Sequence, residues 1–223
     1  MNKTNALLKP LVVGLLVSIM SCNIAQDKNE ETITSGKLRI AVDESYSLLM
    51  ETQVFTYTHL NKYASISSQI APERDVFTAL LADSVQAAVV GRPLTDEELA
   101  FFKSKQRIPE SILIARDGIA LVVHPEHADS VIHLEKVKGI FTGTDSLWSQ
   151  VQPGGSATKI NVVFDNQGSC NARSLREKFS IETFPSWCFS EETTERVIAY
   201  VNTHPNAIGV ISLSWISDAE DST

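Results

Sequence analysis

Strand-like and helix-like patterns alternate along the first half of the chain. Residues 37–42 are β-prone, and apolar positions then recur at steps of three or four from Tyr46 to Leu60, which predicts a strand followed by an amphipathic helix. The same succession occurs twice more before residue 105, and Thr95 stands three residues before Glu98 as a capping-box start for the last helix. This order predicts an α/β fold with a parallel sheet and helices packed on it.

The second half of the chain predicts a further set of strands and helices. Helices are expected at 133–141, over Ala172 to Phe179 and at 193–201, and strands at 159–164 and 207–213. The apolar stretch 112–123 is interrupted by Arg116-Asp117-Gly118. Two interpretations of this stretch stay open, namely two strands or a crossing between two lobes.

The first 21 residues have the features of an export signal. Lys3 and Lys9 precede an apolar run of ten residues, 11–20, which matches a signal-peptide core in length and is too short to span a bilayer comfortably. The run leads into Ser21 and Cys22, and a small residue before a cysteine at this place resembles the lipobox of bacterial lipoproteins. That resemblance implies cleavage before Cys22 and lipidation of the cysteine. An ordinary signal peptide with an incidental cysteine is the alternative.

Export would place the rest of the chain behind a tether and in an environment where cysteines can form disulfides. Residues 22–36 are polar without an apolar period, so we expect a flexible tether between the lipid and the fold. We expect an exported protein, anchored by lipid to a bacterial membrane and facing the periplasm or the cell exterior. That environment permits disulfides, and Cys170 and Cys188 are far enough apart in sequence to form one. Two free thiols are the other possibility.

Composition and charge narrow the function classes. The chain has 223 residues, 43% of them hydrophobic, which is enough for a packed core and for one or two domains. The formal charge is −8, and it becomes −10 once a leader with two lysines and no acidic residue is removed. An acidic chain of this kind is not expected to bind nucleic acid. Three cysteines and five scattered histidines predict no metal site, and no cofactor or catalytic motif is evident.

Four phrases together resemble the phosphate-binding proteins of ABC transporters. They are VQAAVVGRPLTDEEL at 85–99, KGIFTGTDSLW at 138–148, the strand INVV with Gly168-Ser169 after it, and PNAIG at 205–209. The resemblance implies a two-lobed type II periplasmic binding protein fold, in which two α/β lobes close on one ligand.

The resemblance also implies boundaries within the chain. Lobe one is expected at 37–115, lobe two at 116–210, and a return crossing toward lobe one at 211–223. The family normally continues beyond the segment that matches the last phrase. We therefore expect lobe one to lack its last elements, as in a chain truncated at its C-terminus.

The same resemblance implies where a small oxyanion would bind. Ser45 and Tyr46 occupy the places of a hydroxyl and an aromatic residue that contact the anion after the first strand. The anion loop of the family maps onto Gly168, Ser169, Cys170 and Asn171. Both segments begin helices, where free backbone N–H groups suit an anion. Serine also caps helices in many proteins, so plain capping is the alternative.

Two family ligands are replaced in this chain. The aspartate that accepts the proton of hydrogen phosphate is here Gly91, and an arginine before the anion loop is here Asp165. Arg92 and Arg173 are the expected substitutes, because a guanidinium binds oxyanions through two donors. Three alternatives stay open: Arg92 is a solvated surface residue, Asp165 pairs with Arg173, or Asp165 accepts a proton from a ligand or binds an amine.

These observations favour a non-catalytic solute-binding lipoprotein, expected to be a monomer. It would capture a small oxyanion, with phosphate as the first candidate, and present it to an ABC permease in the membrane. The alternative is a sensor or interaction lipoprotein that keeps the fold but binds another ligand or partner. The two replaced ligands are the reason to keep that alternative.

Overall fold

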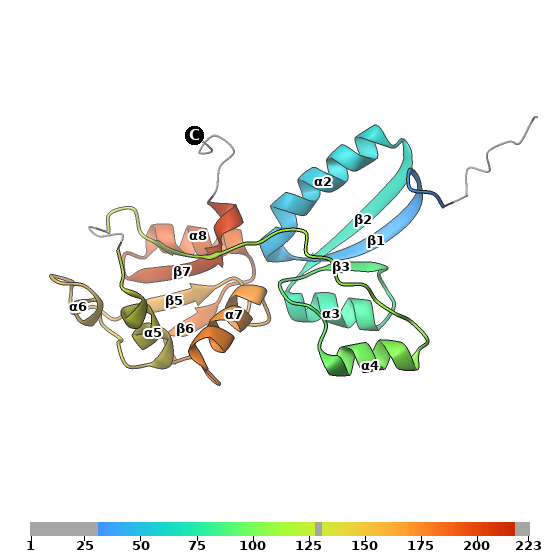
Figure 1. The fold of residues 1–223 in the computed structure, drawn as a ribbon. Coiled ribbons are helices and arrows are strands. Elements are labelled where there is room, and N and C mark those ends of the chain that lie inside the picture. The colour runs from blue at the N-terminus through green and yellow to red at the C-terminus, as the bar shows by residue number, and fades with distance from the viewer. Residues whose placement is uncertain (1–30, 128–130, 217–223) are drawn as a thin grey trace, which may run out of the picture.

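The computed structural model describes residues 31–127 and 131–216, which form two α/β lobes, each built on its own sheet (Figure 1). The sheet of lobe one has the strand order β2-β1-β3, and that of lobe two has the order β4-β7-β5-β6. The predicted signal segment, Cys22 and most of the predicted tether lie outside the described residues, as do residues 217–223.

Lobe one confirms the predicted alternation of strands and helices. Its strands are all parallel, and β1 lies between the other two. The elements in chain order are β1 (Ser35–Asp43), α2 (Ser47–Leu60), β2 (Tyr63–Ala71), α3 (Glu73–Leu81), β3 (Ala87–Val89) and α4 (Asp96–Ser104). The capping box predicted at Thr95 and Glu98 is present at the start of α4.

The first strand of lobe one begins two residues earlier than the sequence pattern predicted. Strand β1 begins at Ser35 rather than at residue 37. Thr32 and Ser35 exchange backbone hydrogen bonds, with N···O distances of 2.9 and 3.4 Å, and so form a turn that leads into the strand. Gly36 has φ of +128°, a conformation that favours glycine.

The chain crosses from lobe one to lobe two through residues 105–118, which contain no helix or strand. Strand β4 (Ile119–Val123) follows, so the apolar stretch at 112–123 is one crossing and one strand. Strand β4 pairs antiparallel with β7 (Ala207–Ser212), and β7 pairs parallel with β5 (Asn161–Phe164). Strand β6 (Cys188–Ser190) completes the sheet beside β5, and its three residues gave no recognisable sequence pattern.

Helices cover the sheet of lobe two, and its central strand is fully enclosed. All six residues of β7 are buried. A Cβ on Gly209 would lie 2.7–2.9 Å from Val122, Val197 and Val201, so glycine permits the close contact with the covering helix. The helices of this lobe are α5 (Leu134–Thr142), α6 (Trp148–Val151), α7 (Cys170–Phe179) and α8 (Thr194–Thr203). No described helix has the length and apolar character needed to cross a membrane.

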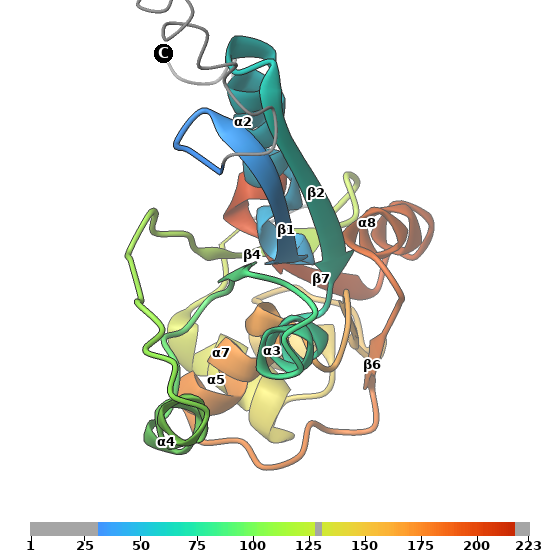
Figure 2. The ribbon, with the colours of Figure 1, turned by 90° about the vertical axis from the view of Figure 1, so that its right-hand side faces the viewer.

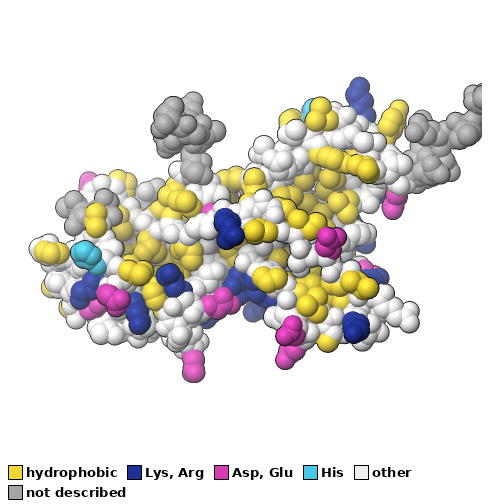
Figure 3. All heavy atoms as spheres, viewed as in Figure 1, with side chains coloured by type: hydrophobic (Ala, Val, Ile, Leu, Met, Phe, Trp, Pro, Cys, Tyr) yellow, Lys and Arg dark blue, Asp and Glu magenta, His cyan; other side chains and the backbone are white. Residues whose placement is uncertain are grey.

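Lobe one leaves much more apolar surface exposed than lobe two. Hydrophobic side chains gather on its visible face over α2, the sheet and the crossing segment (Figure 3). Phe55 on α2 is 62% exposed, and Ile112, Leu113 and Ile114 of the crossing segment are also exposed. Among the described residues, the sheet of lobe one is therefore only partly covered.

The two lobes meet at the residues that follow β1 and β5 (Figures 1 and 2). A short 3-10 turn, η2 (Glu44–Tyr46), follows β1, and a second one, η3 (Leu213–Trp215), follows β7. Ser214 of η3 donates its hydroxyl to the carbonyl of Ser45 at 2.9 Å, and the Thr194 N–H donates to the Glu44 carboxylate at 2.6 Å. These two hydrogen bonds join the turn after β1 in lobe one to η3 and the start of α8 in lobe two.

Candidate functional site: the pocket between the lobes

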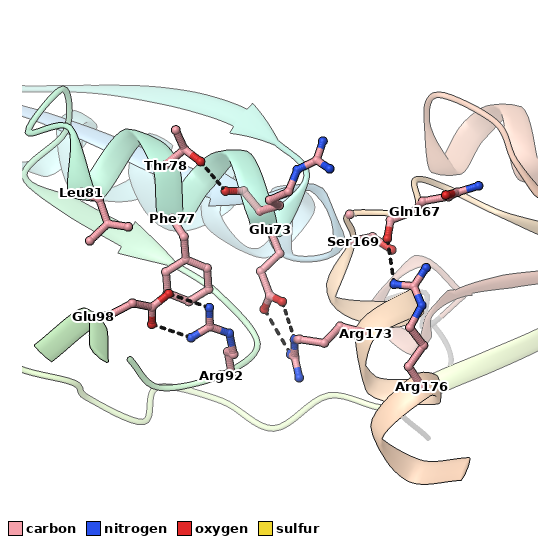
Figure 4. A pocket seen from close by; sticks show the side chains of 12 residues that line it. Glu73, Phe77, Thr78, Leu81, Arg92, Glu98, Gln167, Ser169, Arg173 and Arg176 are labelled. Carbon is pink, nitrogen blue, oxygen red and sulfur yellow. Dashed lines mark hydrogen bonds and ion pairs between the residues drawn. The ribbon is translucent and has the colours of Figure 1, made fainter. Parts of the chain in front are cut away.

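A pocket of about 530 Å³ lies between the two lobes (Figure 4). Lobe one contributes α3 and residues from β3 to α4, and lobe two contributes the loop after β5 and the first half of α7. Its charged lining residues are Arg74, Arg92, Arg173, Arg176, Glu73 and Glu98. Four guanidinium groups against two carboxylates give this pocket a local excess of positive charge in an acidic chain.

The structure brings four of the eight predicted ligand-binding residues to this pocket. Arg92, Gly168, Ser169 and Arg173 line it. Ser169 is the N-cap of α7, and its hydroxyl accepts a hydrogen bond from the Ala172 N–H at 3.2 Å. The start of a ten-residue helix therefore lies at the pocket wall, where its unpaired N–H groups favour negative charge.

Arg92 is held in place by two neighbours rather than solvated. Its guanidinium makes two hydrogen bonds of 2.8 Å to the carboxylate of Glu98 and lies 3.8 Å from the ring centre of Phe77. Glu98 is fixed in turn because it closes the capping box with Thr95. The Arg92 hydrogen bonds lower the pKa of Glu98 to about 2, so this carboxylate stays ionised at neutral pH. The interpretation of Arg92 as a freely solvated residue is wrong, because its side chain is only 23% exposed.

Arg173 pairs with a glutamate of the opposite lobe. Its Nε and Nη2 donate to the Glu73 carboxylate at 2.5 and 3.1 Å, and its Nη1 donates to Glu177 at 2.9 Å. Burial alone would lower the pKa of Arg173, but the hydrogen bonds to both glutamates outweigh burial and raise it. The alternative in which Asp165 pairs with Arg173 is wrong, because Arg173 pairs with Glu73 and Glu177, and Asp165 accepts from Asn171 instead.

The other predicted residues form a buried polar cluster beside the pocket. Ser45 Oγ accepts hydrogen bonds from the Cys170 thiol at 3.2 Å and from the Asn171 amide at 3.3 Å. Asn171 also donates to Asp165 at 3.3 Å. The Cys170 thiol is 3.8 Å from the Tyr46 hydroxyl, so the cluster joins the turn after β1 to the start of α7. These donors are engaged with each other across the two lobes.

Gly91 stands where these groups converge. A Cβ at this position would lie 2.8 Å from the Tyr46 hydroxyl, 3.0 Å from Cys170 Cβ and 3.1 Å from Arg173 Nη2. A side chain here would force its neighbours to move. Its N–H donates to the Glu73 carboxylate at 2.8 Å. The arrangement of the lobes in this structure therefore favours glycine at 91 and places a carboxylate from α3 beside it.

Two buried aspartates end the central strands of the two lobes. Asp43 is the last residue of β1 and Asp165 follows β5, and both are fully buried. Burial raises the pKa of each carboxyl, and repulsion raises it further, from Glu73 at Asp43 and from Asp43 at Asp165. Hydrogen bonds from Ser45 to Asp43 and from Ser169 and Asn166 to Asp165 offset part of this effect. On balance, burial disfavours the ionised form of both carboxyls.

Of the two possibilities left open for Cys170 and Cys188, the structure has two free thiols and no disulfide between them. Cys170 starts α7 and faces Ser45 of lobe one, whereas Cys188 packs against the apolar core of lobe two. No described group of histidine, cysteine or acidic side chains is arranged to hold a metal ion.

Several residues of this site were not predicted from the sequence. Glu73, Arg74 and Arg176 line the pocket, and Asp43 supports the turn after β1. The Pro72-Glu73 pair does carry a signal, because proline followed by glutamate commonly starts a helix and orients the acid at its positive end. Nothing local indicates that this carboxylate reaches the other lobe.

The free thiols lead to a chemical prediction. Burial raises the pKa of Cys188 to about 12 and also raises that of Cys170, so both are protonated and react slowly at neutral pH. In a Cys22→Ser protein, we expect two thiols to react with a maleimide after denaturation and far slower reaction in the native state. Intact mass measured with and without reductant checks it, and a gain of two hydrogens on reduction would contradict it.

The raised pKa of Asp43 predicts how the stability of the protein depends on pH. Because the pKa of Asp43 is raised above its usual 3.8, the stability that its protonated form contributes is present below pH 3.8 and lost as pH rises through the raised value. Asp43→Asn removes the charge and keeps an acceptor for the Ser45 N–H. We expect a higher free energy of unfolding for Asp43→Asn at pH 7 and no gain near pH 3.

Urea unfolding at the two pH values measures this difference, with exposed Glu110→Gln as the matched control. The prediction fails if Asp43→Asn gives the same change in unfolding free energy at both pH values, or if the control gives the same pH-dependent gain.

Comparison with known proteins places this architecture in a family. A model of the PBP superfamily domain matches residues 27–223. The phosphate-binding protein PstS of Bacillus subtilis is 22% identical over 227 residues, covering 98% of this chain and 73% of its own length. The phosphate-binding protein PstS 2 of Streptococcus agalactiae is 27% identical over 119 residues, covering 53% of this chain. This chain's match spans only 39% of that relative's length.

Solved structures agree on the fold. A structure described as a phosphate ABC transporter substrate-binding protein with bound phosphate, from Clostridium perfringens, superimposes with a TM-score of 0.72 at 22% identity. The superposition covers 82% of this chain and 72% of the Clostridium perfringens chain. A regulatory domain of OxyR2 from Vibrio vulnificus also superimposes, with a TM-score of 0.54 at 14% identity over 83% of this chain and 77% of its own. The two-lobed α/β architecture and the family model together establish that this chain belongs to the PBP superfamily.

Proposed function

We propose that this protein is a non-catalytic solute-binding protein that holds a small oxyanion, with phosphate as the first candidate, between its lobes. The observation that carries the proposal is the convergence of four arginines from both lobes on one pocket beside the start of α7. The relatives named as phosphate-binding proteins support phosphate as the ligand to test first.

Each lobe would contribute a guanidinium to the anion. Arg92 comes from lobe one and Arg173 from lobe two, and both line the pocket. Guanidinium groups bind tetrahedral oxyanions through paired, charge-assisted hydrogen bonds. Gly168 and Ser169 would present the start of α7, whose N–H groups complement the remaining negative charge.

The polar cluster would act when the lobes separate. Ser45, Tyr46 and Asn171 bond to one another or to Cys170 in the present arrangement. Opening of the cleft would free these donors for a ligand, and closure would bury it. Asp165 would orient Asn171 through the hydrogen bond between them rather than contact the anion.

The partners follow from this role. A monomer that binds solute outside the cell would deliver it to an ABC permease, with no nucleic acid and no cofactor involved. The alternative is a sensor or interaction protein with the same fold. It is favoured by one observation, namely that the expected donors Ser45, Asn171 and Arg173 are already engaged across the lobes.

Removal of Arg173 tests the proposed ligand site. We expect phosphate to bind the wild-type protein, and Arg173→Gln to weaken binding about tenfold or more, because a charge-assisted hydrogen bond is lost. Isothermal titration calorimetry with phosphate and sulfate measures this. Arg196→Gln is the matched control, since Arg196 forms exposed ion pairs with Glu191 and Glu192 on the surface.

The titrations also separate the two candidate functions. Absence of heat and of thermal shift with every oxyanion would remove the transport proposal and leave the sensor or interaction role. Equal weakening in Arg196→Gln would show that general charge, rather than the pocket, governs binding.

We also propose that the protein is exported and anchored through a lipid on Cys22. The resemblance of the segment before Cys22 to a lipobox supports this. In a bacterial host, Cys22→Ala should abolish incorporation of labelled fatty acid and release the protein from the membrane fraction. A Cys188→Ala variant serves as the control, and membrane association that survives Cys22→Ala would contradict the anchor.

A further inference from the structure

Glu73 occupies a position inside the pocket that is unusual for a carboxylate at an anion site. Its side chain is only 3% exposed, although it lines the pocket wall. As the first residue of α3 after Pro72, it lies at the positive end of that helix, which stabilises its charge. The close view shows its carboxylate directed toward Arg173 of the other lobe (Figure 4).

The Glu73 carboxylate accepts hydrogen bonds from donors that could also bind an external oxyanion. One oxygen of Glu73 accepts from the Gly91 N–H at 2.8 Å and from Arg173 Nη2 at 3.1 Å, and the other accepts from Arg173 Nε at 2.5 Å. A backbone N–H and two nitrogens of one guanidinium form a three-donor site. An external oxyanion that approaches Arg173 meets a site that is already filled.

The same contact joins the lobes. Glu73 lies on lobe one and Arg173 on lobe two, and the next residue, Arg74, donates its backbone N–H to the Gly168 carbonyl of lobe two at 3.2 Å. The start of α3 is thus bonded to the anion loop and to α7 at once. The second partner of Arg173, Glu177, is on the same helix four residues later and is 62% exposed, so it joins nothing across the cleft.

We propose that the Glu73 carboxylate is a resident substitute for the ligand, which holds the cleft closed without ligand and competes with an incoming oxyanion for Arg173 and the Gly91 N–H. The competition rests on the proposed function, whereas the closure does not. An oxyanion binds at this position by displacing the carboxylate, and its own oxygens then replace the three hydrogen bonds. Glu73 therefore sets the affinity threshold and favours ligands with at least two acceptor oxygens on the face toward Arg173.

Two variants separate the carboxylate from its surroundings. Glu73→Gln keeps the shape of the side chain and removes its charge, and Glu177→Gln removes the same charge from the exposed partner of the same guanidinium. Small-angle X-ray scattering of the ligand-free proteins measures closure, and calorimetry with inorganic phosphate measures affinity. The mature chain from residue 22 with Cys22→Ser is used throughout, so that leader and lipid are both absent and the proteins differ at one site.

We expect Glu73→Gln to increase the radius of gyration of the ligand-free protein and to tighten phosphate binding about tenfold or more, with little change in Glu177→Gln. Glu73→Asp retains the charge but shortens the reach, so it should open the cleft and tighten binding less. The circular dichroism spectrum of each variant must match the wild type, and Glu73→Asp supplies the test if Glu73→Gln misfolds.

The outcomes distinguish this inference from the proposed function. If no variant binds phosphate but Glu73→Gln opens the cleft, the closure stands and the oxyanion ligand is wrong. If phosphate binds and Glu73→Gln weakens it or leaves the radius of gyration unchanged, the resident carboxylate is overturned while the oxyanion site remains. If Glu177→Gln tightened phosphate binding as much as Glu73→Gln, the change in net charge would account for the effect, and the inference would also be overturned.

Discussion

A buried ion pair across the cleft is the interaction on which the arrangement of the lobes depends. Glu73 at the start of α3 is 3% exposed, so its charge requires a partner, and Arg173 of α7 supplies it from the opposite lobe. The pair fixes where α7 begins relative to β3 and brings Gly91, Tyr46 and Cys170 within contact of one another. Loss of one member of such a pair leaves the other buried without compensation. Because Glu73 and Arg173 also line the pocket, the same ion pair shapes the pocket and joins the lobes.

The charge at the pocket between the lobes differs in sign from the net charge of the whole chain. The chain carries −8 overall, and its central strands end in two buried aspartates whose pKa values burial raises. Against that background, four arginines at the pocket create a positive region of a few residues. Three of them are positioned by a carboxylate or a ring: Arg92 by Glu98 and Phe77, Arg173 by Glu73, and Arg176 by Phe184. An anion site in an acidic protein depends on such fixed donors, because the overall field repels its ligand.

The fold itself leaves function undetermined. The same two-lobed architecture occurs in a phosphate-bound protein of Clostridium perfringens and in a regulatory domain of OxyR2. In this chain, Glu73 of α3 and Arg173 of α7 bring a carboxylate and a guanidinium together at the lobe junction.

The sequence by itself determined most elements of the fold, but not the three-residue strand β6. Periodicity and caps located β1, the helices of lobe one and the capping box at Thr95, because these features depend on neighbours within a few residues. Four short phrases indicated the family, and Arg92, Gly168, Ser169 and Arg173 were placed at the pocket. Only the tertiary structure decided the pairings: Arg173 with Glu73 rather than Asp165, and Cys170 with Ser45 rather than Cys188. These choices join residues about 100 positions or more apart. The packing of one lobe against the other decides them, and no local pattern carries that information.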